Sequence, residues 1–170
     1  MLDPTLPERI KKLIIMGGCY TSLGNVKSNV EFNFASDPIA AKKVFFSFNK
    51  IHNDIILYPW ETCVEHLIKK EHLDLLNDKD SDTRKFVEKI VHKKEFFPET
   101  GIFADFGSAV YMINKNSLKK SRKSYLDISI DSADSNFGQV ILEKEYSVSK
   151  KDGRNSDKDY CRKKVEIILN

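Results

Sequence analysis

Short apolar runs and amphipathic stretches alternate along the first third of the chain. Residues 13–16 (LIIM) form an apolar run that ends at two glycines, and residues 55–57 form another, so each predicts a fully buried strand. Between these runs, Asp37 and Pro38 precede apolar residues at helical spacing. An N-cap residue followed by a proline at the first helical position predicts a helix that begins there.

A helical period of apolar residues dominates the middle of the chain. Residues 60–76 keep a period near 3.6, and residues 81–94 repeat it behind a Ser/Asp start. A third helix is expected where Asp105 precedes FGSAVYMI. Strand-forming residues then dominate three late segments: residues 125–131, 138–145 and 165–169. This order of elements predicts an α/β domain.

Composition narrows the class of protein. With 170 residues, 41% of them hydrophobic, the chain is long enough for one domain with a buried core. The net charge is only +3, from 28 basic and 25 acidic residues, so a dedicated nucleic-acid binder is not expected. No apolar stretch is long enough to cross a membrane or to serve as a signal core, and no CxxC pair occurs. We therefore expect a cytoplasmic protein without a membrane partner.

The segment from residue 16 to 45 carries the most chemistry. Three glycines, Gly17, Gly18 and Gly24, allow tight turns near a ligand, and a carboxylate lies among carboxamides at Asn25, Glu31 and Asn33. Such groups can grip a polyhydroxylated ligand. In an extended segment, Glu31 and Asn33 would point to one face and Phe32 to the other. By itself the pattern also fits a turn-rich loop, the more frequent origin of such clusters.

The same segment resembles the inosine-uridine preferring nucleoside hydrolase family. MGG, GNV, VEFN and DPIAA stand here at residues 16–18, 24–26, 30–33 and 37–41, in the family's order and nearly at its spacing. The later ILYPWETC, residues 56–63, looks like the PWE-containing segment of the animal branches of the family. The resemblance implies an open, mainly parallel sheet flanked by helices, and cleavage of the N-glycosidic bond of ribonucleosides to base and ribose.

Roles for individual residues follow from the resemblance. It implies that Asn25, Glu31 and Asn33 hydrogen-bond the ribose hydroxyls. It also implies that Met16 lines the sugar pocket and that Phe32 lies near the base. The implied ligand is a ribonucleoside.

A second match, residues 104–114 (ADFGSAVYMIN), resembles the family's HDPLAVAYLL stretch. Asp105 takes the position of a calcium-ligating aspartate, and its carboxylate is a hard oxygen ligand of the kind calcium prefers. A helix N-cap is the alternative reading of Asp105. Ala104 replaces a histidine that can protonate the departing base. Because alanine cannot exchange protons, the sequence assigns no general acid or other catalytic residue.

The main departure from the family is an absent acidic loop. The family's calcium site is built mainly by an N-terminal DxDxGxDD loop, and the 170 residues contain no such cluster. Residues 1–4 match the middle of the family's GPLTNLALALRLDP segment, so we expect residues 1–170 to form one partial domain, the C-terminal portion, with the N-terminal part missing. One carboxylate rarely holds calcium, which takes about 6–8 oxygens. The isolated chain is therefore expected neither to bind calcium tightly nor to hydrolyse nucleosides.

Several alternatives stay open at this point. A truncated or degenerate relative could act by binding a nucleoside or by associating with a partner, and an incomplete gene sequence of an active enzyme explains the missing loop equally well. SLKKSRKS, residues 117–124, could contact nucleic acid, but surface lysines near a helix end or turn are usually solvated. The four histidines, His52, His66, His72 and His92, show neither the HxxxH nor the HExxH spacing of a metal site. A homo-oligomer is compatible with the sequence.

Overall fold

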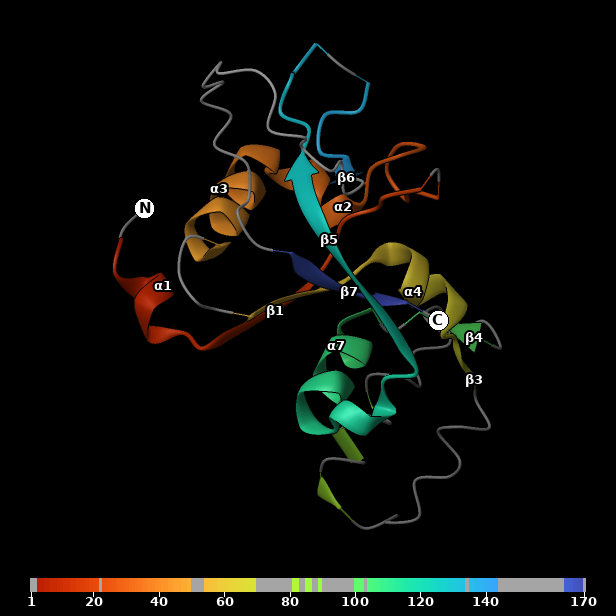
Figure 1. Ribbon diagram of the computed structural model, residues 1–170. Coiled ribbons are helices and arrows are strands. Elements are labelled where there is room, and N and C mark those ends of the chain that lie inside the picture. The colour runs from red at the N-terminus through yellow and green to blue at the C-terminus, as the bar shows by residue number, and fades with distance from the viewer. Residues whose placement is uncertain are drawn as a thin grey trace.

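A five-stranded sheet with helices on both faces organises the molecule (Figure 1). The computed structural model describes residues 3–21, 23–49, 54–69, 81–82, 85–86, 89, 100–102, 104–133, 135–143 and 164–169. In the order in which they lie side by side, the strands of the sheet are β1 (Lys12–Met16), β2 (Asp54–Tyr58), β7 (Val165–Leu169), β5 (Lys120–Ile128) and β6 (Val140–Glu143). A separate antiparallel pair joins β3 (Ile68–Lys69) to β4 (Thr100–Gly101).

The sheet is mixed. β2 is parallel to both β1 and β7, whereas β5 is antiparallel to both β7 and β6. The register pairs Met16 with Tyr58, so the carboxyl ends of β1 and β2 meet at one edge of the sheet. In open α/β sheets, ligands bind outside the carboxyl ends of parallel strands. This edge is therefore the first place to look for a site.

Each face of the sheet has its own apolar cluster, because successive side chains of a strand point to opposite sides. On one face, Ile55 and Leu57 contact the helices α2 (Phe32–Ser36) and α3 (Pro38–Asn49). On the other, Ile56 and Tyr58 contact α4 (Trp60–Glu65) and α7 (Ala104–Ile113). Two further helical elements are α1 (Leu6–Arg9) and the 3₁₀ turn η1 (Lys115–Ser117).

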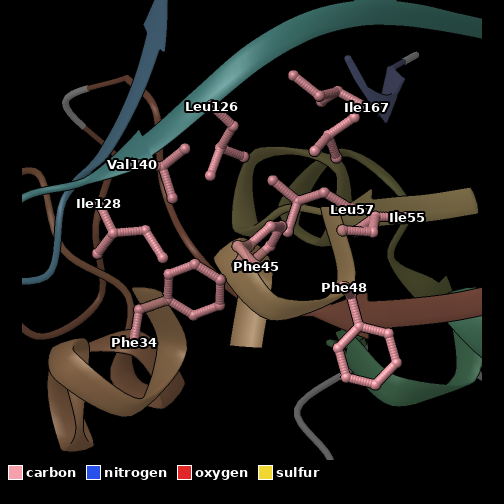
Figure 2. Close-up of a cluster of buried hydrophobic side chains, with 10 residues drawn as sticks. Phe34, Phe45, Phe48, Ile55, Leu57, Leu126, Ile128, Val140 and Ile167 are labelled. Carbon is pink, nitrogen blue, oxygen red and sulfur yellow. The ribbon is translucent and has the colours of Figure 1, made fainter. Parts of the chain in front are cut away.

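The larger cluster is built around aromatic rings. Figure 2 shows Phe34 and Phe45 pointing from the helices toward the side chains of the strands, and Phe48 belongs to the same cluster. The rings of Phe34 and Phe45 meet edge to face, with centroids 5.9 Å apart. Burying a side chain of this size contributes about 1.5–3 kcal/mol. The cluster therefore anchors α2, which begins next to the predicted ribose-binding residues.

Several predicted elements are confirmed. The helix expected after Asp37 is α3, and the Asp37 carboxylate accepts a 2.8 Å hydrogen bond from the backbone N–H of Ala40. The apolar run at residues 13–16 is β1, but all five of its residues are half-buried rather than fully buried. The reason is position, since β1 is an edge strand of the described sheet and pairs with a neighbouring strand on one side only.

Other predictions need correction. A continuous helix over residues 60–76 is wrong, because α4 ends at Glu65 and Ile68–Lys69 pairs as a strand with Thr100–Gly101. Residues 70–80 lie outside the described part, and of residues 81–94 it describes helix at 82, 85, 86 and 89. Of the basic cluster, Lys119 follows the 3₁₀ turn η1, whereas Lys120, Arg122 and Lys123 lie in β5 rather than at a helix end or turn. Among the described residues, no helix has the length and apolarity needed to cross a membrane.

Candidate functional site

The loop that follows β1 continues the pairing of β1 with β2 beyond both strands. The backbone N–H of Gly17 donates to the carbonyl of Tyr58 at 3.1 Å, and the N–H of Trp60 donates to the carbonyl of Gly18 at 2.9 Å. One residue later, the carbonyl of Cys19 accepts from the N–H of Val140 at 3.1 Å. The loop is thus tied to β6 as well, and its path is fixed at the carboxyl edge of the sheet.

Two glycines are required in this loop for steric reasons. Gly17 has φ +146° and Gly18 has φ +76°, in the region that residues with a Cβ rarely adopt. A Cβ on Gly18 would lie 2.6 Å from Cγ2 of Val140, and one on Gly17 would lie 2.8 Å from the ring of Phe34. Neither space can hold a methyl group. The MGG sequence therefore encodes a close approach of backbone and core side chains.

Glu31 is the centre of the polar arrangement. Its side chain is only 2% exposed. Oε2 accepts from the backbone N–H groups of Gly18 at 2.8 Å and Phe34 at 3.3 Å, and Oε1 accepts from that of Asn33 at 2.8 Å. Glu31 is thus the N-cap of α2. The segment is not extended beyond Glu31, because the helix begins at Phe32 and needs an acceptor for its first N–H groups.

The predicted carboxamides lie around the start of the same helix. Oδ1 of Asn25 accepts from the backbone N–H of Phe32 at 2.8 Å. Nδ2 of Asn33 lies 3.3 Å from Sδ of Met16 and 3.5 Å from its carbonyl oxygen. The side chains of Asn25 and Asn33 are exposed, as is Phe32, at 62%. The structure therefore brings Met16, Asn25, Glu31, Phe32 and Asn33 together at one loop and one helix start.

The start of α7 lies at the same end of the sheet. Cys63 in α4 is buried, and burial raises the pKa of its thiol to about 12, with the negative charges of Glu31 and then Asp105 adding to the shift. The backbone of α7 comes close to β2, since a Cβ on Gly107 would lie 2.2 Å from the hydroxyl oxygen of Tyr58. Asp105 is exposed in the first turn of α7, one residue after Ala104.

A family model for the inosine-uridine preferring nucleoside hydrolases matches residues 1–166. The chain belongs to this family. The resemblance found in the sequence is therefore confirmed, and so is the α/β fold that it implies.

Curated relatives cover parts of this nucleoside hydrolase chain. Uridine nucleosidase 1 of Arabidopsis thaliana is 44% identical over 45 residues, which is 26% of the chain and 13% of that protein. An uncharacterised protein of Schizosaccharomyces pombe is 28% identical over 138 residues, which is 76% of the chain and 40% of that protein. The chain thus spans less than half of each of these two relatives.

Solved structures share the fold. A plant nucleoside hydrolase superposes with a TM-score of 0.73 at 20% identity, covering 99% of the chain and 52% of that structure. An inosine-guanosine nucleoside hydrolase gives 0.71 at 22% identity, covering 91% and 45%. The inosine-uridine preferring hydrolase of Bacillus anthracis gives 0.63 at 18%, covering 99% and 49%. The nucleoside hydrolase chain therefore corresponds to about half of a neighbour's fold.

Asp105 is the predicted calcium ligand among the described residues. Among them, no group of three or more His, Cys, Asp or Glu side chains is placed to hold a metal ion. Asp105 offers one hard oxygen ligand, and its place in the first turn also suits a helix N-terminus. Nδ1 of His66 is hydrogen-bonded to the carbonyl of Thr62 at 2.9 Å, and the other three histidines lie outside the described part.

Sequence reasoning missed Glu61, the glutamate of the PWE segment. It is 5% exposed, and Oε1 accepts from the backbone N–H groups of Tyr20 at 2.8 Å and Thr21 at 2.7 Å. The signal was available in the sequence, because the PWE segment directly follows β2, whose end lies beside the loop after β1. An acidic residue at that place can reach the backbone amides of the loop.

The two described cysteines should be poor nucleophiles in the folded chain. Burial raises the pKa of Cys19 from 9.0 to about 11 and that of Cys63 from 9.0 to about 12. At pH 8, we expect iodoacetamide to label Cys19 and Cys63 about 100-fold more slowly in the folded chain than in urea. Peptide mass spectrometry after timed quenching measures this, and equal rates in both states would contradict the assignment.

These thiols also predict alkaline destabilisation. A folded-state pKa raised above the unfolded value contributes stability that is complete below pH 9 and is lost as the pH rises toward 11 to 12. The free energy of unfolding, measured by urea titration, should therefore be lower at pH 10.5 than at pH 8. The fall should be smaller in Cys63→Ala than in the wild-type chain. An identical fall in both would show that Cys63 contributes nothing to it.

Proposed function

We propose that this chain supplies the ribose-binding part of a nucleoside hydrolase domain, which in its complete form cleaves the N-glycosidic bond of ribonucleosides to base and ribose. The observation that carries the proposal is the arrangement around Glu31. One buried carboxylate fixes the glycine loop and the start of α2, so that Met16 and Asn33 lie in contact at the carboxyl edge of the sheet. Residues 1–170 are proposed to be one partial domain, its C-terminal portion.

The proposed roles follow from the chemistry of the side chains. Asn25 and Asn33 offer carboxamides, which can donate to and accept from ribose hydroxyls. Glu31 accepts one N–H at Oε1 from Asn33, and a carboxylate oxygen can accept a second donor, such as a ribose hydroxyl. Met16 would line the sugar pocket, and the exposed ring of Phe32 would lie near the base. Each role depends on the loop and helix start keeping their observed positions.

Hydrolysis needs more than these residues. In a complete domain, a bound calcium ion would hold sugar hydroxyls and make a water more acidic. The described residues offer it the carboxylate of Asp105 and no set of three His, Cys, Asp or Glu ligands. Ala104 cannot protonate a leaving base, and a general acid is worth about 100-fold to 10,000-fold in rate. We therefore propose that the chain alone neither binds calcium tightly nor releases ribose.

A second candidate function is nucleoside binding without catalysis. Ala104 and the lone Asp105 favour it, since they remove a proton donor while the ribose-binding residues are kept. Such a relative would act by binding a ribonucleoside or by associating with a partner, including another copy of itself. In either case we propose a cytoplasmic protein in nucleoside catabolism or purine salvage, with a ribonucleoside as ligand and no role for nucleic acid or membrane.

Equilibrium dialysis and a ribose-release assay test the proposal together. We expect the chain to bind inosine and uridine, to bind free ribose more weakly, and not to bind hypoxanthine. We also expect no ribose release with or without added calcium. Failure to bind either nucleoside would contradict the ribose-binding role. Turnover close to that of a complete hydrolase would contradict the claim that the chain alone is inactive.

A further inference from the structure

We propose that Glu61 is a positioning residue for ribose binding: it holds the loop at residues 19–21 so that Met16 and Asn33 keep their contact. The inference rests on the proposed function, because it concerns the same sugar-binding loop. Glu61 itself is placed beneath this loop, on α4, and is 5% exposed. It belongs to none of the groups proposed to contact the nucleoside.

One carboxylate oxygen of Glu61 accepts hydrogen bonds from several donors of the loop at residues 19–21. Oε1 accepts from the backbone N–H groups of Tyr20 and Thr21, from the hydroxyl of Thr21 at 2.8 Å, and from the thiol of Cys19 at 3.3 Å. An ionised acceptor makes such hydrogen bonds stronger than a neutral one. Consecutive amides that converge on a single buried carboxylate oxygen fix the bend of the loop.

The surroundings of the other carboxylate oxygen indicate that Glu61 does not serve mainly to stabilise the fold. Oε2 of Glu61 is buried and has no hydrogen-bond partner among the described residues. Burying a carboxylate oxygen without a partner opposes folding. Glu61 lies in the first turn of α4, yet its hydrogen bonds among the described residues go to the loop at residues 19–21 rather than to its own helix. What its position does provide is the geometry of the loop.

Two buried carboxylates therefore hold one loop at neighbouring residues. Glu31 binds the N–H of Gly18, and Glu61 binds those of Tyr20 and Thr21. Trp60, the neighbour of Glu61, donates its N–H to the carbonyl of Gly18. If Glu61 is lost, residues 19–21 lose their acceptor and Gly18 can relax from its positive φ. A shift of Gly17 and Gly18 then moves Met16, whose Sδ accepts a hydrogen bond from Nδ2 of Asn33.

The test compares Glu61→Leu, which removes the acceptor, with Glu61→Gln, which keeps one acceptor oxygen. Glu8→Gln, at an exposed site on α1, is the control. We expect Glu61→Leu to speed amide hydrogen exchange at Tyr20 and Thr21 by at least about tenfold, with Leu57 in the core unchanged. Inosine affinity should fall about tenfold or more, because small displacements of binding groups are costly. Glu61→Gln should recover most of both.

A further readout reports the charge itself. Burial and then the negative charge of Glu61 raise the pKa of Cys19, so Glu61→Gln should speed the labelling of Cys19 while leaving that of Cys63 nearly unchanged. If Glu61→Leu does not fold, the Gln variant still decides through Cys19 labelling, because the Cys19 thiol lies 3.3 Å from Oε1 of Glu61. A labelling rate of Cys19 that is the same in Glu61→Gln and in the wild type would overturn the proposal.

The outcomes separate the two proposals. In Glu61→Leu, unchanged exchange at Tyr20 and Thr21, or a uniform rise that includes Leu57, would overturn the positioning role. Faster loop exchange with unaltered inosine affinity would overturn it as well, because the loop would then be irrelevant to the ligand. If the wild-type chain binds no nucleoside, the proposed function fails and this role in binding fails with it. The exchange data would in that case still show whether Glu61 holds the loop.

Discussion

Replacing Gly18 with alanine should lower the free energy of unfolding by about 2–5 kcal/mol. Two costs add. A positive φ of +76° is unfavourable for alanine, and the new methyl would lie 2.6 Å from Cγ2 of Val140 and 3.0 Å from the ring of Phe34. Neither neighbour can move easily, since both are buried in the main apolar cluster. Because a domain of this kind is stable by only about 5–15 kcal/mol, urea unfolding should detect the change clearly.

A double variant separates the two costs. Val140→Ala removes the methyl group that Gly18→Ala would meet, while the unfavourable φ stays. The double variant should therefore lose at least about 1 kcal/mol less than the sum of the two single variants. Strictly additive losses would show that the contact with Val140 does not limit the site, and the steric explanation of the MGG sequence would then be wrong.

Glu31→Ala should lower the free energy of unfolding by about 3–5 kcal/mol. The substitution leaves the N–H groups of Gly18, Asn33 and Phe34 without their carboxylate acceptor. It also removes the N-cap of α2 and leaves a cavity where a 2% exposed side chain had been. Inosine binding should be lost together with stability, because the loop and the helix start are joined through this residue.

Two variants serve as controls for that result. Glu31→Gln keeps one acceptor oxygen but turns an N–H donor toward backbone donors, so its loss should lie between those of the wild type and Glu31→Ala. Glu8→Gln changes an exposed carboxylate on α1 and should stay within about 0.5 kcal/mol of the wild type. If Glu31→Ala proves as mild as Glu8→Gln, the hydrogen bonds to Glu31 carry no weight in the fold.

Local signals in the sequence predicted the elements whose causes are local. Asp37 and Pro38 predicted the start of α3, because helix capping and the fixed φ of proline act within one helical turn. The helix predicted over residues 60–76 failed for the opposite reason. Ile68–Lys69 pairs with Thr100–Gly101, about thirty residues later, and no helical period within a short window can reveal that pairing.

The residues of the candidate site could be predicted from the sequence, but some of their contacts could not. The glycines and carboxamides could be picked out because MGG, GNV and VEFN stand in a recognisable order. The structure places them together, while their proposed roles toward ribose stay predictions. What could not be read from spacing is that Glu31 is an N-cap for α2 and an acceptor for Gly18, since glutamate is an uncommon cap and Gly18 is thirteen residues away.

The role of Glu61 could not be predicted from residue spacing alone. It lies about forty residues after the loop that it holds, and the sequence offered only its place in PWE. Parallel pairing of β1 with β2 is what brings the two together, because it sets both strand ends at the same edge. A search for acidic residues just after each predicted parallel strand would have found it.

A nucleoside titration followed by two-dimensional ¹H–¹⁵N NMR tests the central claim most directly. If Met16, Asn25, Glu31 and Asn33 form a ribose-binding surface, inosine and ribose should shift the amides of Gly17, Gly18 and Phe32 and the side-chain amides of Asn25 and Asn33. Asn33→Ala should weaken these shifts while leaving the other resonances in place. Shifts confined to residues outside the loop and the start of α2, such as those of β5, would contradict the account.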